Sequence, residues 1–218
     1  MPILKPLNAR SKIVESLIHN MLKKIGVASI ISSDASIIRK AEKLILPGVG
    51  SFDQGVKNLE ARGLISLLNE KVLQQKSPIL GICLGAQLFT KNSEEGQLPG
   101  LGWFEAQTCR FQFGGGSAVT NANQKLKVPH MGWNLVYPTK QNILFHGLDE
   151  SPRFYFVHSF HFRCQNSSDV LANTQYGYEF PSAMHHENIF GVQFHPEKSH
   201  KFGLRLLKNF AEYESQAA

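Results

Sequence analysis

A cysteine between two glycines, Gly81-Ile82-Cys83-Leu84-Gly85, stands where an apolar run meets a predicted helix. This G-x-C-x-G pattern is a cysteine version of the nucleophile elbow, a sharp turn from strand to helix. The turn pushes the middle side chain out of the sheet, and free N–H groups at the start of the helix favour a thiolate. Taken alone, a cysteine at the end of a strand is more often a small buried hydrophobic residue.

His195 and Glu197 form a second candidate group, in the segment Gln193-Phe194-His195-Pro196-Glu197 at the end of another apolar run. An imidazole takes the proton of a thiol, and a carboxylate beside it fixes the tautomer and orientation of the ring. An isolated histidine is more often structural. Because folds bring triad members together from distant parts of a chain, we expect Cys83, His195 and Glu197 to form a catalytic triad.

A glycine-rich turn, Pro47-Gly48-Val49-Gly50-Ser51-Phe52, follows a further apolar run. Such turns expose backbone N–H groups at the carboxyl edge of a parallel sheet. These donors, together with the N–H of Leu84, are candidates for an oxyanion hole. The alternative interpretation is an ordinary tight turn.

The elements that must position these groups can be predicted from hydrophobic periodicity. In the first ninety residues, helical and short buried segments alternate, which is typical of a parallel α/β sheet. We expect helices at 13–25, 59–73 with a break at Gly63, and 84–91, and strands at 27–31, 44–46 and 79–82.

Strand patterns dominate the second half, at 153–157, 170–174, 182–185 and 189–194, before a final helix at 198–213. Residues 114–124 read as a flexible loop within a domain rather than a linker between domains. We therefore predict one domain over 1–218. Its fold class is α/β, an open, mainly parallel sheet flanked by helices, with additional antiparallel strands in the C-terminal half.

Composition narrows the class of protein. Hydrophobic residues make up 42% and charged residues 18%, as in ordinary globular domains. No apolar run reaches membrane-spanning length, and the first ten residues contain no secretion signal. Three cysteines without a CxxC pair argue against disulfides and structural zinc and favour the cytoplasm.

The net charge of +6 is scattered, with Lys23–Lys24 as its largest cluster, so we expect an anionic metabolite or an acidic partner rather than nucleic acid. We expect no cofactor. His158, His161, His185, His186 and Cys164 lack standard ligand spacing, so we also expect no metal site.

Six segments together carry a resemblance that no single one would support. They resemble the class I, triad-type glutamine amidotransferases, and within these the glutaminase subunits of imidazole glycerol phosphate synthases. The segments are PGVGSF (47–52), GICLGAQLF (81–89), SEEG (93–96), KVPHMGWN (127–134), YFVHSF (155–160) and GVQFHPEKS (191–199).

The resemblance implies that Cys83 attacks the side-chain amide of glutamine, forms a γ-glutamyl thioester and releases ammonia, while His195 transfers protons. It implies that the backbone at Ser159 and Phe160 contacts the substrate, although the family commonly has Tyr at the second position. The expected substrate-binding positions are Val49, Gly50, Leu84, Gln87, Glu95, Ser159 and Phe160.

The resemblance also implies a heterodimer with a (β/α)8-barrel cyclase subunit, which uses the ammonia in histidine biosynthesis and faces Met131 and Trp133. Three alternatives remain open. The chain is a paralogue that serves another synthase, such as one that aminates a surface-polysaccharide sugar; it is an inactive interaction subunit; or it is a γ-glutamyl peptidase, which would lack the KVPHMGWN segment.

The N-terminal segment 1–12 departs from the family pattern. The family normally opens with a buried strand and the turn Asp-Tyr-Gly-Met-Gly-Asn, whereas here residues 6–12 read Pro-Leu-Asn-Ala-Arg-Ser-Lys and the strand shrinks to Ile3-Leu4. We expect residues 6–12 to stay at the surface and to leave the strands at 27–31 and 79–82 with unpaired edges, which would lower stability.

Overall fold

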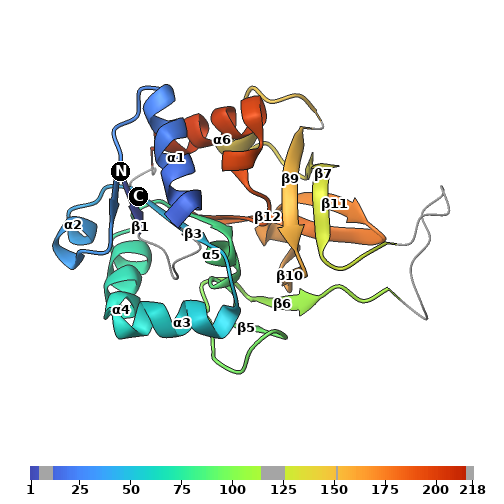
Figure 1. The fold of residues 1–218 in the computed structure, drawn as a ribbon, viewed down its shortest axis with the longest axis horizontal. Coiled ribbons are helices and arrows are strands. Elements are labelled where there is room, and N and C mark those ends of the chain that lie inside the picture. The colour runs from blue at the N-terminus through green and yellow to red at the C-terminus, as the bar shows by residue number, and fades with distance from the viewer. Residues whose placement is uncertain (5–11, 114–125, 151, 215–218) are drawn as a thin grey trace.

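The computed structural model describes residues 1–4, 12–113, 126–150 and 152–214 (Figure 1). The predicted loop at 114–124 and most of the atypical segment 6–12 lie outside these residues.

One eight-stranded sheet organises the fold. Its first five strands are parallel, and the remaining three continue it in antiparallel fashion. In spatial order they are β2 (Ile30–Ser32), β1 (Pro2–Leu4), β3 (Leu44–Gly48), β4 (Ile79–Cys83), β13 (Ile189–Val192), β12 (Tyr178–His186), β11 (Val170–Tyr176) and β8 (Tyr137–Pro138). The predicted α/β class, with its antiparallel strands in the C-terminal half, is confirmed.

Two smaller sheets complete the strands. One pairs β7 (His130–Leu135) with β9 (Arg153–His158), and the other orders β10 (Phe160–Cys164), β6 (Ala106–Arg110) and β5 (Asn92–Ser93). Because β9 and β10 are separated only by Ser159, one turn of the chain joins the two small sheets.

Helices cover both faces of the large sheet. Figure 1 shows α1 (Lys12–Lys24) and α6 (His200–Glu212) together on one side, and α3 (Phe52–Ala61) and α4 (Leu64–Asn69) on the other. The shorter helical elements are α2 (Ala35–Arg39), a π-helical turn at Glu70–Gln74, α5 (Leu84–Gln87), and 3-10 turns at Ile143–Phe145, Ser167–Asp169 and Pro196–Lys198.

The strands divide the core because successive side chains point to opposite faces. Ile45 of β3 belongs to the hydrophobic cluster that includes α1 and α6, whereas its neighbours Leu44 and Leu46 belong to the cluster that includes α3 and α4. All three are fully buried, as a parallel sheet covered on both faces requires.

Local sequence explains where the helices begin and end. In α1, Val14, Ile18 and Leu22 recur four residues apart and are buried against the sheet. The helix ends just before Gly26, which adopts a φ of +79°. Gly63, with a φ of +64°, separates α3 from α4, so the predicted break is confirmed.

Two predicted elements need correction. The helix expected at 84–91 is the four-residue α5, because the chain turns away at Leu88 to reach β5. The strand expected at 27–31 is β2 at Ile30–Ser32, where pairing with β1 fixes its position.

The expected unpaired edges were also wrong. Pro2–Leu4 lies inside the sheet, paired with Ile30–Ser32 on one side and, through Ile3, with Ile45 on the other. The strand β4 lies between β3 and β13 and is paired on both sides. Pro2, which has no N–H to donate, is tolerated in this central strand because it stands at the first position. No described helix is long and apolar enough to cross a membrane.

Candidate active site

Cys83 is the last residue of β4, and the chain turns there directly into α5. Its backbone has a φ of 53° and a ψ of −114°, a strained combination for a residue with a side chain. The glycines on either side are required by close packing. A Cβ on Gly85 would lie 1.8 Å from the carbonyl oxygen of Leu46, and one on Gly81 would lie 2.6 Å from the Cα of Ala86. The elbow geometry predicted from the sequence is present.

His195 lies three residues beyond the end of β13. Its backbone N–H donates to the carbonyl of Tyr155, which fixes the segment against β9. The 3-10 turn at Pro196–Lys198 then bends the chain back, so that the Oε1 of Glu197 lies 2.7 Å from the Nδ1 of His195. The two side chains are 0% and 1% exposed, respectively, so this contact is shielded from water.

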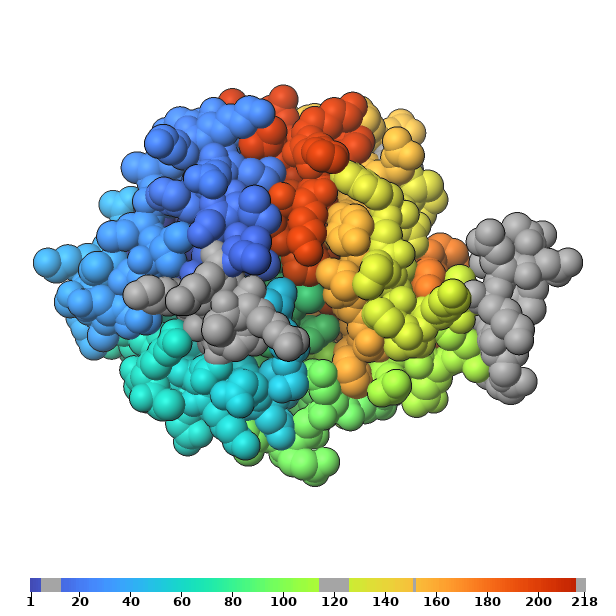
Figure 2. Space-filling model, in the orientation of Figure 1, coloured from blue at the N-terminus to red at the C-terminus, as the bar shows by residue number. Residues whose placement is uncertain are grey.

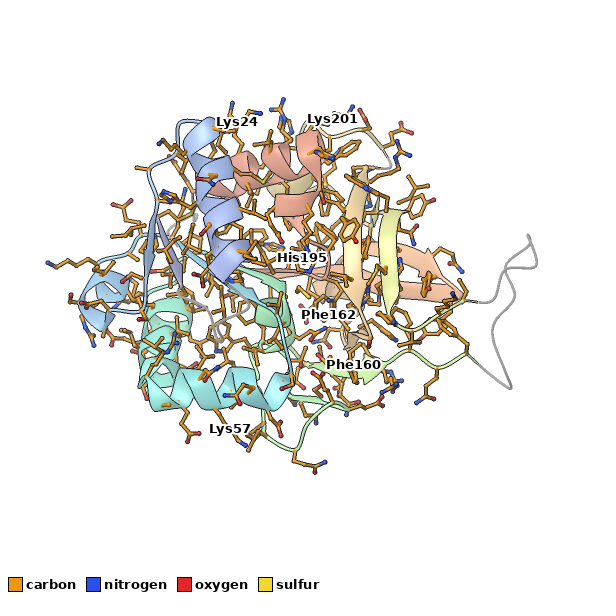
Figure 3. All side chains as sticks on the ribbon, viewed as in Figure 1. Lys24, Lys57, Phe160, Phe162, His195 and Lys201 are labelled. Atoms are coloured by element: carbon orange, nitrogen blue, oxygen red, sulfur yellow. The ribbon has the colours of Figure 1, made fainter. Side chains whose placement is uncertain are left out.

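The register of the sheet explains how the two halves of the site meet. Strands β4 and β13 are parallel neighbours, with Gly81 opposite Gly191 and Ile82 opposite Val192. The residues that follow the two strands therefore emerge at the same carboxyl edge of the sheet. Figure 3 shows His195 in the middle of the molecule, between the helices and the small sheets.

The electrostatics of His195 reflect both neighbours. Burial alone would lower its pKa, but the attraction of Cys83 and Glu197 outweighs burial and raises the pKa of His195 to about 10. With Nδ1 occupied by Glu197, the buried Nε2 has no hydrogen-bond partner among the described residues. An imidazolium held in this way is poised to exchange a proton through Nε2.

The glycine-rich turn lies directly beside the elbow, because Gly48 of β3 stands opposite Cys83 of β4. Gly50 has a φ of +115°, which only glycine adopts readily. Val49 is partly buried against the core, and Leu84 is the first residue of α5. The expected oxyanion-hole positions are thus gathered around the cysteine.

The expected substrate-binding side chains lie on either side of this edge. The carboxylate of Glu95 accepts a 2.8 Å hydrogen bond from the N–H of Phe52, and burial raises its pKa. The amide nitrogen of Gln87 donates to the carbonyl of Phe160 at 3.3 Å. The carbonyl of Ser159, in the turn between β9 and β10, accepts from the N–H of Phe111 at 3.1 Å.

Two features of the site were not found from the sequence. The amide nitrogen of Gln193 lies 3.7 Å from the Sγ of Cys83. His130 and His158 form a buried pair, with 3.0 Å between Nδ1 of the first and Nε2 of the second. A signal was nevertheless available in the sequence. Each of these polar residues lies in a strand or directly after one, where a buried polar group without a partner is costly, so each could have been expected to have a hydrogen-bond partner.

The exposed face of β7 carries the two residues expected at a partner interface. Met131 is 61% exposed and Trp133 45% exposed. The Trp133 ring stacks on His200 at the start of α6, with 5.4 Å between ring centroids. Figure 2 shows the residues of β7 and β9, in yellow and orange, forming one continuous surface beside α6, in red.

The other histidines have ordinary partners. His161 contacts the carbonyl of Phe162 and the hydroxyl of Tyr178, while His186 pairs with Asp169. Within the described ranges no three His, Cys, Asp or Glu side chains come together in a way that could hold a metal ion.

A nucleophile elbow and a histidine–glutamate pair at one edge of an α/β sheet are typical of enzymes that use a cysteine nucleophile. Comparison with known proteins shows which family of these enzymes the chain belongs to. The model of the family "Glutamine amidotransferase class-I" matches residues 7–212, so the chain belongs to this family.

Among its relatives, imidazole glycerol phosphate synthase subunit HisH 2 of Methanococcus maripaludis is 52% identical over 193 residues, which are 88% of this chain and 91% of the relative. The protein of the same name from Pseudomonas aeruginosa is 45% identical, with the same coverage. A solved structure described as a glutamine amidotransferase shares the fold with a TM-score of 0.69 at 20% identity, covering 96% of this chain and 99% of that one.

Proposed function

We propose that the chain is the glutaminase subunit of an imidazole glycerol phosphate synthase. It hydrolyses glutamine to glutamate and ammonia, which a cyclase subunit then uses. One observation carries the proposal. The strained Cys83 at the elbow interacts electrostatically with the buried His195, whose Nδ1 is hydrogen-bonded to Glu197. The names and the 45–52% identity of the two relatives support the particular synthase.

In the proposed reaction, the Sγ of Cys83 attacks the side-chain amide carbon of glutamine as a thiolate. The tetrahedral intermediate collapses when protonated His195 gives its Nε2 proton to the departing nitrogen, and ammonia and a γ-glutamyl thioester result. Neutral His195 then removes a proton from water, whose oxygen attacks the thioester to release glutamate. Glu197 keeps the ring oriented and stabilises its positive charge throughout.

The remaining residues of the site bind the substrate in this proposal. The N–H groups around Val49, Gly50 and Leu84 stabilise the oxyanion of the tetrahedral intermediate. The glutamine is held by the backbone at Ser159 and Phe160 and by the side chains of Gln87 and Glu95. Because the contact at position 160 is made by the backbone, it survives the change from the family's Tyr to Phe. Gln87 uses both N–H groups within the protein, which leaves its Oε1 to accept a hydrogen bond from an ammonium group.

The partner in this proposal is a cytoplasmic cyclase subunit with a (β/α)8-barrel, and it covers the face around Met131 and Trp133. Two large exposed apolar side chains close together are typical of a protein interface. The whole chain acts as a single domain, because both hydrophobic clusters pack on the same eight-stranded sheet.

A paralogous role is the second candidate. Both relatives described above carry the number 2 in their names, which distinguishes one such subunit from another. A second copy that serves a different synthase, such as one that aminates a surface-polysaccharide sugar, would keep the same catalytic residues and differ only in its partner.

The test is ammonia release from glutamine, measured with the wild-type chain and with Cys83→Ala, each mixed with the cyclase subunit of the same organism and its acceptor substrate. The proposal expects glutamine hydrolysis and cyclised product with the wild type, and neither with Cys83→Ala, although both chains bind the cyclase. Hydrolysis without binding of the cyclase would favour the paralogous role. No hydrolysis by the wild type in its complex would favour a non-enzymatic interaction subunit.

A further inference from the structure

A fully buried amide, that of Gln193, lies beside the sulfur of Cys83, although Gln193 is not a member of the expected triad. Gln193 follows β13 directly, two residues before His195, and its backbone N–H donates to the carbonyl of Ser182 at 2.9 Å. Its Nε2 lies 3.7 Å from the Sγ of Cys83, and its Oε1 lies 3.0 Å from the Nε2 of Gln87. The side chain therefore bridges the cysteine and the glutamine one helical turn after it.

The direction of these hydrogen bonds is fixed by a backbone group. The carbonyl of Phe160 can only accept, so the Gln87 atom 3.3 Å from it is the amide nitrogen. That nitrogen also donates to Gln193, so the Gln193 atom on this side is the oxygen. The nitrogen of Gln193 must then face the sulfur of Cys83 and donate to it.

A second chain of hydrogen bonds holds the same carbonyl in place. His158 donates from Nδ1 to the carbonyl of Phe160 at 2.7 Å and accepts at Nε2 from the Nδ1 of His130 at 3.0 Å. His130 in turn accepts at Nε2 from the amide of Asn134, whose nitrogen also donates to a backbone carbonyl. Both rings are neutral in this arrangement, and burial lowers the pKa of each. The carbonyl of Phe160, which sets the orientation of the Gln87 and Gln193 amides, therefore accepts hydrogen bonds from both Gln87 and His158.

We propose that Gln193 is a positioning residue that donates a hydrogen bond to the sulfur of Cys83 and so favours the thiolate in its attacking orientation. The inference rests on the proposed function only in taking Cys83 as the nucleophile. A donor held in a buried site stabilises a negative acceptor strongly and needs no reorganisation when the charge appears. His195 interacts with the sulfur as an acid or base, whereas Gln193 has no proton to exchange and acts by position alone.

The test removes the donor and measures the nucleophile without glutamine. Gln193→Met keeps the approximate length and volume of the side chain, and Gln193→Leu is a second variant in case the first does not fold. The rate of Cys83 alkylation by iodoacetamide is followed from pH 6 to 10 by mass spectrometry of the Cys83 peptide. His195, which interacts with Cys83, and the two titratable groups that interact with His195 in turn, Glu197 and His158, remain in every variant.

We expect the pH midpoint of alkylation to rise by about one unit in both variants, since a hydrogen bond to a charged group is worth about that much. The kcat for glutamine should fall while KM changes little. The matched control is Gln107→Met, because Gln107 lies 3.7 Å from a different cysteine, Cys109, and should leave the Cys83 profile unchanged.

An unchanged midpoint in folded Gln193→Met or Gln193→Leu protein, even with a lower thermal midpoint, would overturn the proposal and make Gln193 merely structural. Iodoacetamide requires neither glutamine nor partner. A chain without glutaminase activity would therefore count against the proposed function and leave this measurement interpretable.

Discussion

At the scale of single residues, the charge on His195 decides how the proposed reaction proceeds. The ring is buried, yet Cys83 and Glu197 raise its pKa to about 10, so it carries a proton near neutral pH. Glu197 contacts the ring directly, with 2.7 Å between its Oε1 and the Nδ1 of His195. Removing its charge should therefore affect catalysis more than substrate binding.

Glu197→Gln keeps the shape of the side chain and removes its charge. We expect kcat for glutamine hydrolysis to fall by about a hundredfold or more, with KM changed little, because the carboxylate orients and stabilises the ring that transfers protons and takes no part in holding the glutamine. Steady-state kinetics in the presence of the cyclase would measure both constants. Glu150→Gln, at an exposed position far along the chain, is the control. An unchanged kcat would mean that Glu197 is only structural.

At the scale of elements, the short strand β1 occupies a central place in the sheet. Ile3 is fully buried and pairs with Ile31 on one side and Ile45 on the other. Ile3→Ala should lower the free energy of unfolding by about 2–5 kcal/mol, through lost burial and the cavity left behind. Urea unfolding would measure the change. Ile13→Ala is the matched control, since Ile13 is 70% exposed, and it should change stability by less than about 0.5 kcal/mol. Equal effects would contradict the central place of β1.

Two buried histidines, His130 of β7 and His158 of β9, lie opposite each other in the pairing of these strands. Burial lowers the pKa of His130 to about 4 and that of His158 well below its usual value, with the nearby His130 lowering it further. Below about pH 6.5 these two histidines bind protons in the unfolded chain but stay neutral in the folded chain. The free energy of unfolding therefore falls as the pH falls towards 4. In His130→Gln this fall should be shallower between these two pH values. Urea unfolding at several pH values would measure the slope, and identical slopes would mean that His130 does not contribute.

Sequence reasoning succeeded where one contiguous segment contains all the information. The helix at Lys12–Lys24, the break at Gly63 and the elbow at Cys83 follow from local spacing and from glycine geometry. It failed where contacts between distant segments determine the position or length of an element. The strand at Pro2–Leu4 is too short to be recognised as central without its neighbours, and the four residues of α5 end where tertiary contacts redirect the chain.

The same limit applies inside the site. Cys83 and His195 stand in recognisable motifs, so their roles could be proposed from the sequence. The contact of Gln193 with the cysteine and the pairing of His130 with His158 join residues far apart in the chain, through side-chain geometry that no local pattern encodes.

At the scale of the whole molecule, the exposed face of β7 connects the site to its surroundings. The same strand presents Trp133 outward and holds His130 inward in the hydrogen-bond chain that leads to Phe160. A partner bound to this face would contact the strand that pairs with β9, next to the turn between β9 and β10 that we propose to bind the substrate.

Trp133→Ala should weaken binding of the cyclase by about tenfold or more, because exposed aromatic residues at interfaces often contribute over 1 kcal/mol. Titration calorimetry would measure the dissociation constant. Tyr137→Ala is the control, since Tyr137 is 43% exposed, close to the 45% of Trp133, but belongs to the edge strand β8. Equal losses for the two variants would place the interface elsewhere.

The central claim is that Cys83 is the nucleophile for glutamine, and covalent labelling tests it most directly. The wild-type chain, in complex with its partner at pH 7.5, is treated with a diazoketone analogue of glutamine and the modified peptide is identified by mass spectrometry. Burial raises the pKa of Cys109 and raises that of Cys164 to about 12, so both stay protonated and unreactive. The account predicts one label per chain, on Cys83, which excess glutamine prevents. A label on Cys109 or Cys164, or labelling of Cys83 that glutamine does not slow, would contradict it.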